Sequence, residues 1–286
     1  MKKLFFLCCI CSLTFSAYAQ KEKIKGNKIV STERYDVEPF HTIEIYESFE
    51  VTLDESSDSQ VKIEADSNIQ RVIQIEVVDS VLTIKSDKDL RRAKALNIDI
   101  LYGAELKKIV LYDKVNAKSL SAIKSSGLTV EVNDYAEVFL TTETGNLSCV
   151  SYGKSRAELH ASATSIVYQV NENSEVKGIV TADKFKIDLY QKATAELEGE
   201  VQFMQLRTDN ETDFYGTKLN ATKASLLTEG SSDNYVQIQE EITIEAKDKS
   251  EIFLLGEPKI SIQGFTNEAA LFKKNIDYTP SKLRLN

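Results

Sequence analysis

A short hydrophobic pattern that returns about every nineteen residues constrains this chain more than any other feature. In each copy, alternating apolar residues surround a central one, as Leu128 and Val132 flank Val130. The central residues stand 19, 19, 19, 19, 19, 20 and 18 positions apart, and they are Leu111, Val130, Cys149, Tyr168, Ile187, Leu206, Leu226 and Ile244. A fixed period in this range is typical of a stacked repeat protein.

Each repeat consists of two strand-like pieces joined by a polar corner. After residues 128–132 come Asn133 and Asp134, and then residues 136–138 alternate again. Asn and Asp are usual turn formers, and a coil this short buries its apolar face only by stacking on its neighbours. The sequence therefore predicts an all-β chain folded as a parallel β-helix, a solenoid of roughly nineteen-residue coils. The crossover rule makes that helix right-handed.

A β-sandwich is the competing fold. It would join antiparallel strands by tight hairpins, for which Asn-Gly and Asp-Gly are the strongest sequence signals. The chain contains neither dipeptide, and its regular repeat also favours coils.

The predicted organisation has four parts. Residues 1–19 are expected to be a signal peptide, with Lys2 and Lys3 before an apolar run and Ala17-Tyr18-Ala19 as the cleavage site. A flexible leader (20–38), the β-helix domain (39–264) and a C-terminal cap and tail (265–286) follow. Short helical turns are expected at 88–94 and at 266–271. An exported location follows: the periplasm, the outer-membrane surface or outside the cell, with no integral membrane segment after cleavage.

Net charge limits the classes of binding partner that we expect, and cysteine content limits disulfide formation. The chain has 35 basic and 44 acidic residues, and loss of the signal peptide leaves 33 basic residues and a net charge of −11. This balance disfavours nucleic acids and anionic membrane surfaces as partners. Cys149 would be the one cysteine left, so no disulfide forms within the chain. Its inward position predicts a small buried hydrophobe and not a reactive thiol.

Several motifs resemble a known family. They are the opening Phe40-x-x-Ile43, Phe49-x-Val51-x-Leu53, Val61-x-Ile63-x-Ala65-Asp66-x-Asn68, Ile75-Glu76-Val77 and the closing Ser250-x-Ile252-x-x-x-Gly256-x-Pro258-x-Ile260. Over about residues 39–262 the chain is similar to the putative auto-transporter adhesin, head GIN domain family. The glycine-serine-glycine corners of that family remain here only in part, as Ser125-Ser126-Gly127 and Gly230-Ser231-Ser232. The resemblance implies an exported β-helical domain, and it supplies no catalytic residues.

The most unusual candidate cluster is acidic. Six carboxylates precede an apolar residue at comparable places in successive coils: Glu137, Glu158, Glu175, Glu196, Asp213 and Glu251. We expect them on one outward face about one rung apart, where like charges repel. Splayed side chains, interspersed bases such as Lys118 and Lys177, or a bound divalent cation would relieve that repulsion. A solvated acidic face and a cation site both stay open.

These observations favour a secreted, non-catalytic module of the cell envelope, an adhesin that binds a surface glycan, another polymer or an envelope protein. No catalytic residue and no cofactor is predicted, and His41 and His160 lie too far apart in coil order to share a site. One alternative is a pectinase-like, polysaccharide-active enzyme, which would need three or more carboxylates and a Lys or Arg to converge in a groove. A second alternative is a structural envelope protein without a ligand. Any specific site is expected where the repeat breaks, near residues 222–235 or in the N-terminal third.

Overall fold

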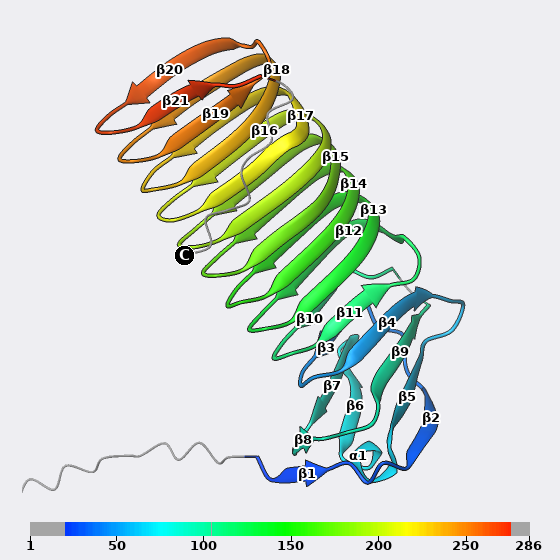
Figure 1. Cartoon of the computed structure of the whole chain (residues 1–286). Helices are drawn as coiled ribbons and strands as arrows, with labels where there is room; N and C mark the ends of the chain where they lie inside the picture. Colours follow the sequence, from blue (N-terminus) through cyan, green and yellow to red (C-terminus); the bar gives the residue numbers. More distant parts are fainter. Residues whose placement is uncertain (1–20, 104, 276–286) are drawn as a thin grey trace, which may run out of the picture.

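The protein is a long parallel β-solenoid (Figure 1). The computed structural model describes residues 21–103 and 105–275. Successive coils pair in parallel, with Glu137 beside Arg156 and Arg156 beside Glu175, so that one coil takes nineteen residues. The predicted all-β fold class is confirmed. The predicted signal peptide (1–19) and the end of the predicted tail lie outside the described residues.

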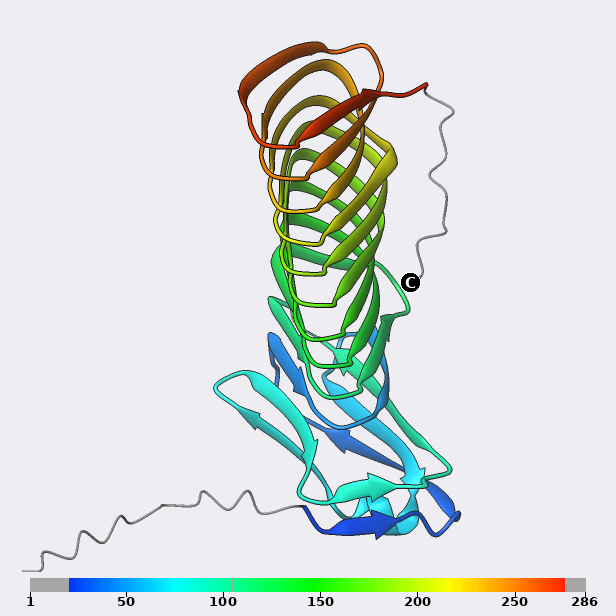
Figure 2. The same ribbon diagram turned by 60° about the vertical axis from the view of Figure 1, so that its left-hand side comes forward.

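Long bent strands build the regular part of the rod. Each runs through most of one coil, so the predicted piece after one polar corner and the predicted piece before the next corner are parts of a single strand (Figure 2). These strands are β12 (Ile123–Val132), β13 (Glu137–Ser151), β14 (Arg156–Val170), β15 (Glu175–Leu189), β16 (Thr194–Thr208), β17 (Asp213–Thr228) and β18 (Asp233–Ala246). The last coils are shorter pieces: β19 (Glu251–Leu255), β20 (Lys259–Phe265) and β21 (Ala270–Lys273).

The core is a ladder of inward side chains at the predicted central positions. Val130 lies beside Cys149, and Cys149 beside Tyr168, and the ladder continues in register to Ile244. All of these residues are at most 2% exposed. One step of the prediction is wrong: Ile109, not Leu111, pairs with Val130. The first coil step is therefore 21 residues long and not 19. The predicted centre, Leu111, lies two residues beyond the true one.

The polar corners are four-residue turns stacked on one another. In the turn Asn133–Ala136, the N–H of Ala136 donates to the carbonyl oxygen of Asn133 at 3.0 Å. The second residue of each corner has a positive φ, which Asp134 (60°) and Gly153 (77°) adopt readily. The fourth residue is small and buried, as Ala136 and Ser155 are. The turn formers predicted from the sequence thus occupy these corners.

The N-terminal third departs from the repeat. Here β3 (Thr42–Ile45) and β4 (Glu50–Glu55) form the first coil. The chain then passes below that coil, where β7 (Val81–Ser86) pairs with β3 and β9 (Leu96–Tyr102) with β4. It returns above the coil as β10 (Lys108–Leu111) and β11 (Asn116–Ser119), which pair with β3 and β4 on their other sides. The first coil is therefore enclosed by chain that follows it in sequence.

Three local predictions are wrong in this region and at the opposite end. The expected flexible leader contains β1 (Lys23–Lys25), which pairs with β8 (Asp89–Arg91), and β2 (Val30–Asp36), which pairs antiparallel with β5 (Gln60–Asp66). The expected helix at 88–94 is consequently strand β8, because its partner comes from far away in the sequence. The expected cap at 266–271 is another corner followed by β21, which stacks on β19.

The remaining elements complete the N-terminal end. Strand β6 (Ile73–Val78) forms an antiparallel hairpin with β7, and β5 also pairs antiparallel with β9. The helix α1 (Ser67–Gln70) was not predicted, and its four residues are too few to show a helical period. No helix among the described residues is long and apolar enough to cross a membrane.

Candidate functional site

Two rows of outward side chains run along one face of the solenoid. The first row follows the strand register through Glu50, Asn116, Glu137, Arg156 and Glu175. The second row lies two positions further along each strand and contains Thr52, Lys118, Phe139, Glu158 and Lys177. Residues two apart on a strand point to the same side of the sheet, so the two rows share one surface.

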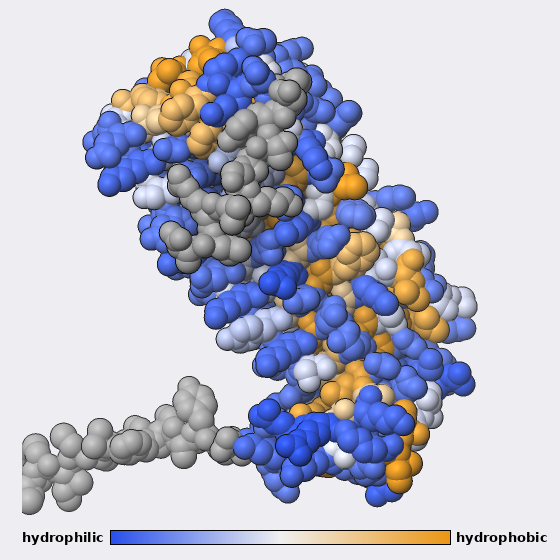
Figure 3. All heavy atoms as spheres, in the orientation of Figure 1, coloured by the Kyte–Doolittle hydropathy of each residue, from blue (hydrophilic) through white to orange (hydrophobic). Residues whose placement is uncertain are grey.

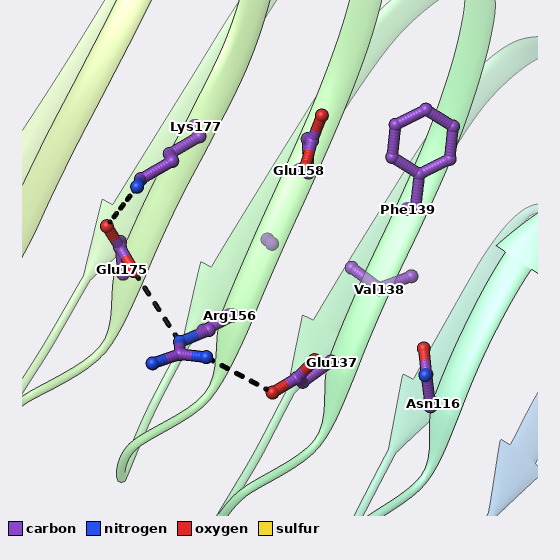
Figure 4. A pocket seen from close by; sticks show the side chains of 9 residues that line it. Asn116, Glu137, Val138, Phe139, Arg156, Glu158, Glu175 and Lys177 are labelled. Atoms are coloured by element: carbon purple, nitrogen blue, oxygen red, sulfur yellow. Dashed lines mark hydrogen bonds and ion pairs between the residues drawn. The ribbon is translucent and has the colours of Figure 1, made fainter.

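Between these rows lies a groove of about 440 Å³ that crosses neighbouring coils (Figure 4). We call it the charged groove. It is lined by Asn116, Glu137, Val138, Phe139, Arg156, Ala157, Glu158, Glu175 and Lys177. A second hollow of about 390 Å³ shares Asn116 and extends the surface toward the N-terminal third, where it is lined by Glu50, Val51, Thr52, Glu64, Asn97, Asp99 and Lys118. The polar surface is thus longer than one pocket.

A chain of ion pairs organises the charged groove. Arg156 lies 3.5 Å from both Glu137 and Glu175, its neighbours in the coils on either side. Lys177 lies 2.8 Å from Glu175 and 3.6 Å from Glu196. Its hydrogen bond with Glu175 raises the pKa of Lys177 above the ordinary value, although burial opposes the shift. Exposed pairs of this kind contribute about 0–1 kcal/mol each, so their main effect is to orient the side chains.

The six predicted acids lie on one outward face, but they are not aligned one rung apart, because the structure divides them between the two rows. Glu137, Glu175, Asp213 and Glu251 belong to the first row, whereas Glu158 and Glu196 belong to the second. Arg156 and Lys177 stand between acids of their own rows. Of the three sources of relief considered, an interspersed base is present at Lys177, which lies close to Glu175 and Glu196. In the described residues no three His, Cys, Asp or Glu side chains converge as metal ligands would.

The extension of the surface is anchored by Asp99. Its carboxylate lies 2.8 Å from Lys62 Nζ and accepts a hydrogen bond from Thr52. Partial burial alone would raise the pKa of Asp99, but the hydrogen bonds from Lys62 and Thr52 outweigh it and hold the pKa below the ordinary value. Asp99 is therefore held in its charged form as the ion-pair partner of Lys62.

Phe139 is the aromatic residue of the charged groove. Its side chain is 37% exposed, and its ring meets the His160 ring edge to face at 5.3 Å. His41 instead contacts Thr42 at the start of β3. The two histidines therefore do not share a site, as predicted. Phe139 thus places apolar surface beside the charged groups of the groove.

A different set of aromatic residues continues the second row toward the C-terminal end. The rings of Tyr215, Tyr235, Phe253 and Phe272 stack in sequence, with centroids 4.4–5.3 Å apart and nearly parallel planes. Stacked rings cover one another's faces. A sugar ring packs on an aromatic face, so this stack is less suited to sugar binding than Phe139.

Cys149 takes no part in the surface. It is buried in the core ladder, as predicted, and burial raises the pKa of its thiol to about 12. Because the thiolate is the reactive form, this residue is not a nucleophile at neutral pH.

Sequence reasoning named Glu158, Glu196, Lys118 and Lys177, but it missed Phe139 and did not show that these residues form a separate second row. Phe139, Glu158 and Lys177 follow the first-row residues at i+2, so the signal was present in the strand alternation. What the sequence lacked was the register that makes them neighbours. The charged groove lies in regular coils and not near residues 222–235, whereas the second hollow does reach the N-terminal third. The register of β17 is irregular at residues 216–223.

The arrangement of side chains in the charged groove is compatible with ligand binding or with catalysis. Its carboxylates and cations offer hydrogen-bond acceptors and donors to a polar ligand. The same groove also brings Glu137, Glu158 and Glu175 together with Arg156 and Lys177, which is the grouping expected for a polysaccharide-active enzyme. However, Arg156 lies between Glu137 and Glu175 and pairs with both, so these two carboxylates already have a cationic partner.

Comparison of the sequence with models of protein families finds one matching family. The model of the family described as "Putative auto-transporter adhesin, head GIN domain" matches residues 39–179 and 160–258. Together these matches span most of the chain. A comparison with curated proteins finds no match.

Solved structures share the fold at low sequence identity. A putative adhesin from Parabacteroides distasonis ATCC 8503 is 17% identical, with a TM-score of 0.67, and the match covers 88% of this chain and 100% of that chain. A putative adhesin from Parabacteroides merdae ATCC 43184 is 16% identical, with a TM-score of 0.63 and coverage of 88% and 99%. A putative lipid binding protein from P. distasonis is 16% identical, with a TM-score of 0.59 and coverage of 88% and 100%. At these identities the likeness shows the fold alone.

Proposed function

This chain belongs to the putative auto-transporter adhesin, head GIN domain family, and on that premise we propose that it is an exported, non-catalytic module that binds an extended polymer of the cell surface. The family and the similar structures suggest a cell-surface adhesin role. The observation that carries the proposal is the charged groove, which crosses several coils and continues toward the N-terminal third.

The geometry of the groove suits a linear ligand. Neighbouring rungs lie roughly 4.8 Å apart, so a polymer along the solenoid axis meets a new pair of outward side chains at each rung. Contacts that are individually weak add up when one chain makes several of them. Phe139 offers an apolar ring, while Arg156 and Glu158 offer polar groups to hydroxyls.

Charge narrows the ligand class. The surface that includes both hollows carries more carboxylates than bases, with Glu50, Glu64 and Asp99 adding to the acids of the groove. A polyanion would be repelled by this excess. We therefore favour a glycan that is neutral or carries amino groups.

The test is a binding screen with immobilised neutral, amino-bearing and acidic glycans. We expect binding to neutral or amino-bearing glycans, and we expect Phe139→Ala to weaken it by about tenfold, equivalent to roughly 1.4 kcal/mol. Phe203→Ala is the matched control, because Phe203 is also exposed (43%) but does not line the groove. Equal loss in both variants, or none in Phe139→Ala, would contradict the groove as the site. A blank screen together with a blank pull-down from envelope extract would favour a structural protein without a ligand.

The grouping of three carboxylates and two bases favours one second candidate, a polysaccharide-active enzyme. Glu158 is the residue to test in that case, because it lies 3.9 Å from His160 and forms no ion pair with a lysine or arginine of the described chain. Incubation with the same glycans distinguishes the enzyme from the adhesin. Release of oligosaccharides that stops in Glu158→Gln, while binding persists, would establish catalysis. Binding without release supports the adhesin.

A further inference from the structure

The C-terminal end of the solenoid leaves inward-facing side chains uncovered. Ile260 and Ile262 continue the rows of Ile242 and Ile244, which are buried. No further coil covers them in the described chain, and they are 44% and 54% exposed. Phe265, which pairs with the buried Ala246, adds to the same patch at 38%, and hydrophobic surface gathers at this end in Figure 3. The core ladder thus ends in an apolar face.

The backbone at this end is open as well. Strand β20 pairs with β18, and β21 pairs with β19. Within residues 21–103 and 105–275, these are the only pairings of β20 and β21, so each strand has one open edge. Unpaired N–H and C=O groups on an edge strand are a template for pairing with another chain. Apolar side chains and open backbone groups therefore coincide.

The opposite end differs, because it is covered. Ile69 of α1 and Leu90 of β8 are buried against the core there, and the β1–β8 ribbon crosses beneath the first coils (Figure 2). A head-to-tail stack of copies would need an open coil at both ends. One open end can meet only another open end, which gives a two-fold, self-limiting dimer and not a fibre.

We propose that the open coil is the interface of an end-to-end dimer of this chain, in which β20 pairs antiparallel with the same strand of a second copy. The register break after Ile262 limits regular pairing to the first part of β20. Pairing centred on Ser261 places Ile260 opposite the partner's Ile262, so that both apolar residues become buried.

Charge is compatible with this contact. Lys259 is the only charged residue of β20, and antiparallel pairing separates the two copies of Lys259. Each chain has a formal net charge of −9. Because Coulomb repulsion falls with distance, two acidic rods repel least when they meet end to end. The dimer is independent of the proposed glycan binding.

Sedimentation equilibrium of the purified chain over a wide concentration range tests the proposal. We expect a concentration-dependent dimer that Ile260→Lys weakens by about tenfold or more, because an edge lysine opposes strand pairing. Ile179→Lys is the matched control, since Ile179 is equally exposed (44%) but lies in β15. Thermal unfolding of both variants checks that they fold. A wild-type monomer at all concentrations, or undiminished pairing in Ile260→Lys, would overturn the proposal.

A crosslink supplies a second test that does not depend on weakening the interface. Directly opposed residues of an antiparallel pair have Cα atoms about 4.5–5.5 Å apart, within the range of a disulfide. Ser261→Cys should therefore form a covalent dimer under mild oxidation much faster than Ser162→Cys, an exposed position in β14. Equal rates would refute the register. If truncation after Asn275 turned a monomer into a dimer, the chain's own C-terminal residues would be the occupant and the proposal would be wrong.

Discussion

At the scale of single residues, Tyr168 is the largest side chain of the core ladder and carries a polar group into it. It is fully buried and packs edge to face on Phe185 at 5.4 Å. Its hydroxyl has no hydrogen-bond partner among the described residues. Burial raises the pKa of Tyr168 well above the ordinary value. Burial of the unpaired hydroxyl thus costs free energy, and the packing of the ring offsets that cost.

Removing this hydroxyl should therefore stabilise the protein or leave it unchanged. We expect Tyr168→Phe to raise the free energy of unfolding by about 1 kcal/mol, because an unpaired buried polar group costs about 1–3 kcal/mol. Urea denaturation measures the change. Tyr135→Phe, at a side chain that is 55% exposed, should stay within about 0.5 kcal/mol of the wild type. A clear loss of stability in Tyr168→Phe would show that the hydroxyl is hydrogen-bonded.

Asp66 shows the opposite case, a buried charge that is well satisfied. Its carboxylate accepts backbone N–H groups from Lys94 at 2.5 Å, from Ala95 at 3.3 Å and from Lys28. Burial alone would raise the pKa of Asp66, but these hydrogen bonds hold it below the ordinary value of 3.8. One side chain thereby joins the β1–β2 turn to the segment before β9.

The lowered pKa gives a pH-dependent prediction. The charged carboxylate stabilises the fold above pH 3.8, and that contribution is lost as the pH falls through the lower pKa of the folded state. Asp66→Asn should cost about 1–3 kcal/mol at neutral pH, because an amide leaves a buried N–H unpaired. The difference from wild type should shrink in acid. Denaturant titrations across pH check this, with the exposed Asp58→Asn as control, and a difference independent of pH would contradict it.

At the scale of one element, close backbone approach between coils limits which residues a strand can contain. Gly178 of β15 has a φ of 136°, and an added Cβ would lie 2.0 Å from the carbonyl oxygen of Leu159. Gly127 of β12 also lies within a strand, but an added Cβ there meets nothing within 4 Å. The same residue type thus meets different surroundings in two coils of the solenoid, β12 and β15.

This contrast predicts opposite effects of the same substitution. Gly178→Ala should lower the free energy of unfolding by about 1–3 kcal/mol, because backbone atoms cannot move aside and the conformation is strained for alanine. Gly127→Ala should be neutral or stabilise by up to about 1 kcal/mol by reducing the freedom of the unfolded chain. Thermal unfolding of both variants compares them. A Gly178→Ala protein as stable as Gly127→Ala would disprove the close approach.

At the scale of the whole molecule, the solenoid is a series of interchangeable coils. Glu175 pairs with Arg156 on one side and with Thr194 on the other, so removal of residues 175–193 brings Thr194 beside Arg156 without changing which residues point inward. The stability of such an array is close to a sum of coil and neighbour terms.

Deletion of residues 175–193 should therefore leave a folded rod that is shorter by about 4.8 Å. Removal of only residues 175–184 ends within a coil and should abolish cooperative unfolding, because the remaining half coil cannot stack in register. Small-angle scattering measures the length, and circular dichroism follows unfolding. Loss of structure in the full-coil deletion, or its survival in the half-coil deletion, would contradict the coil as the unit of the fold.

Much of the regular rod was predictable, because its signals are local. The alternation around Val130 and Cys149 identified buried positions, and the polar corner at Asn133 and Asp134 identified a turn. The first coil was misaligned at Leu111, since a 21-residue step looks the same as a 19-residue one when the pattern repeats at i+2. The strands of the expected leader were missed because their partners, β5 and β8, lie far away in sequence.

The sequence by itself determined the fold class, the inward face of each regular coil and the burial of Cys149, since side-chain alternation along a strand is a local property. Only the tertiary structure decided which outward residues are neighbours, because that depends on the register between strands. Register placed Arg156 between Glu137 and Glu175, moved Glu158 into the other row and gathered the charged groove. It also left the coil of Ile260 and Ile262 open, since a ladder of buried residues ends where no further coil stacks on it.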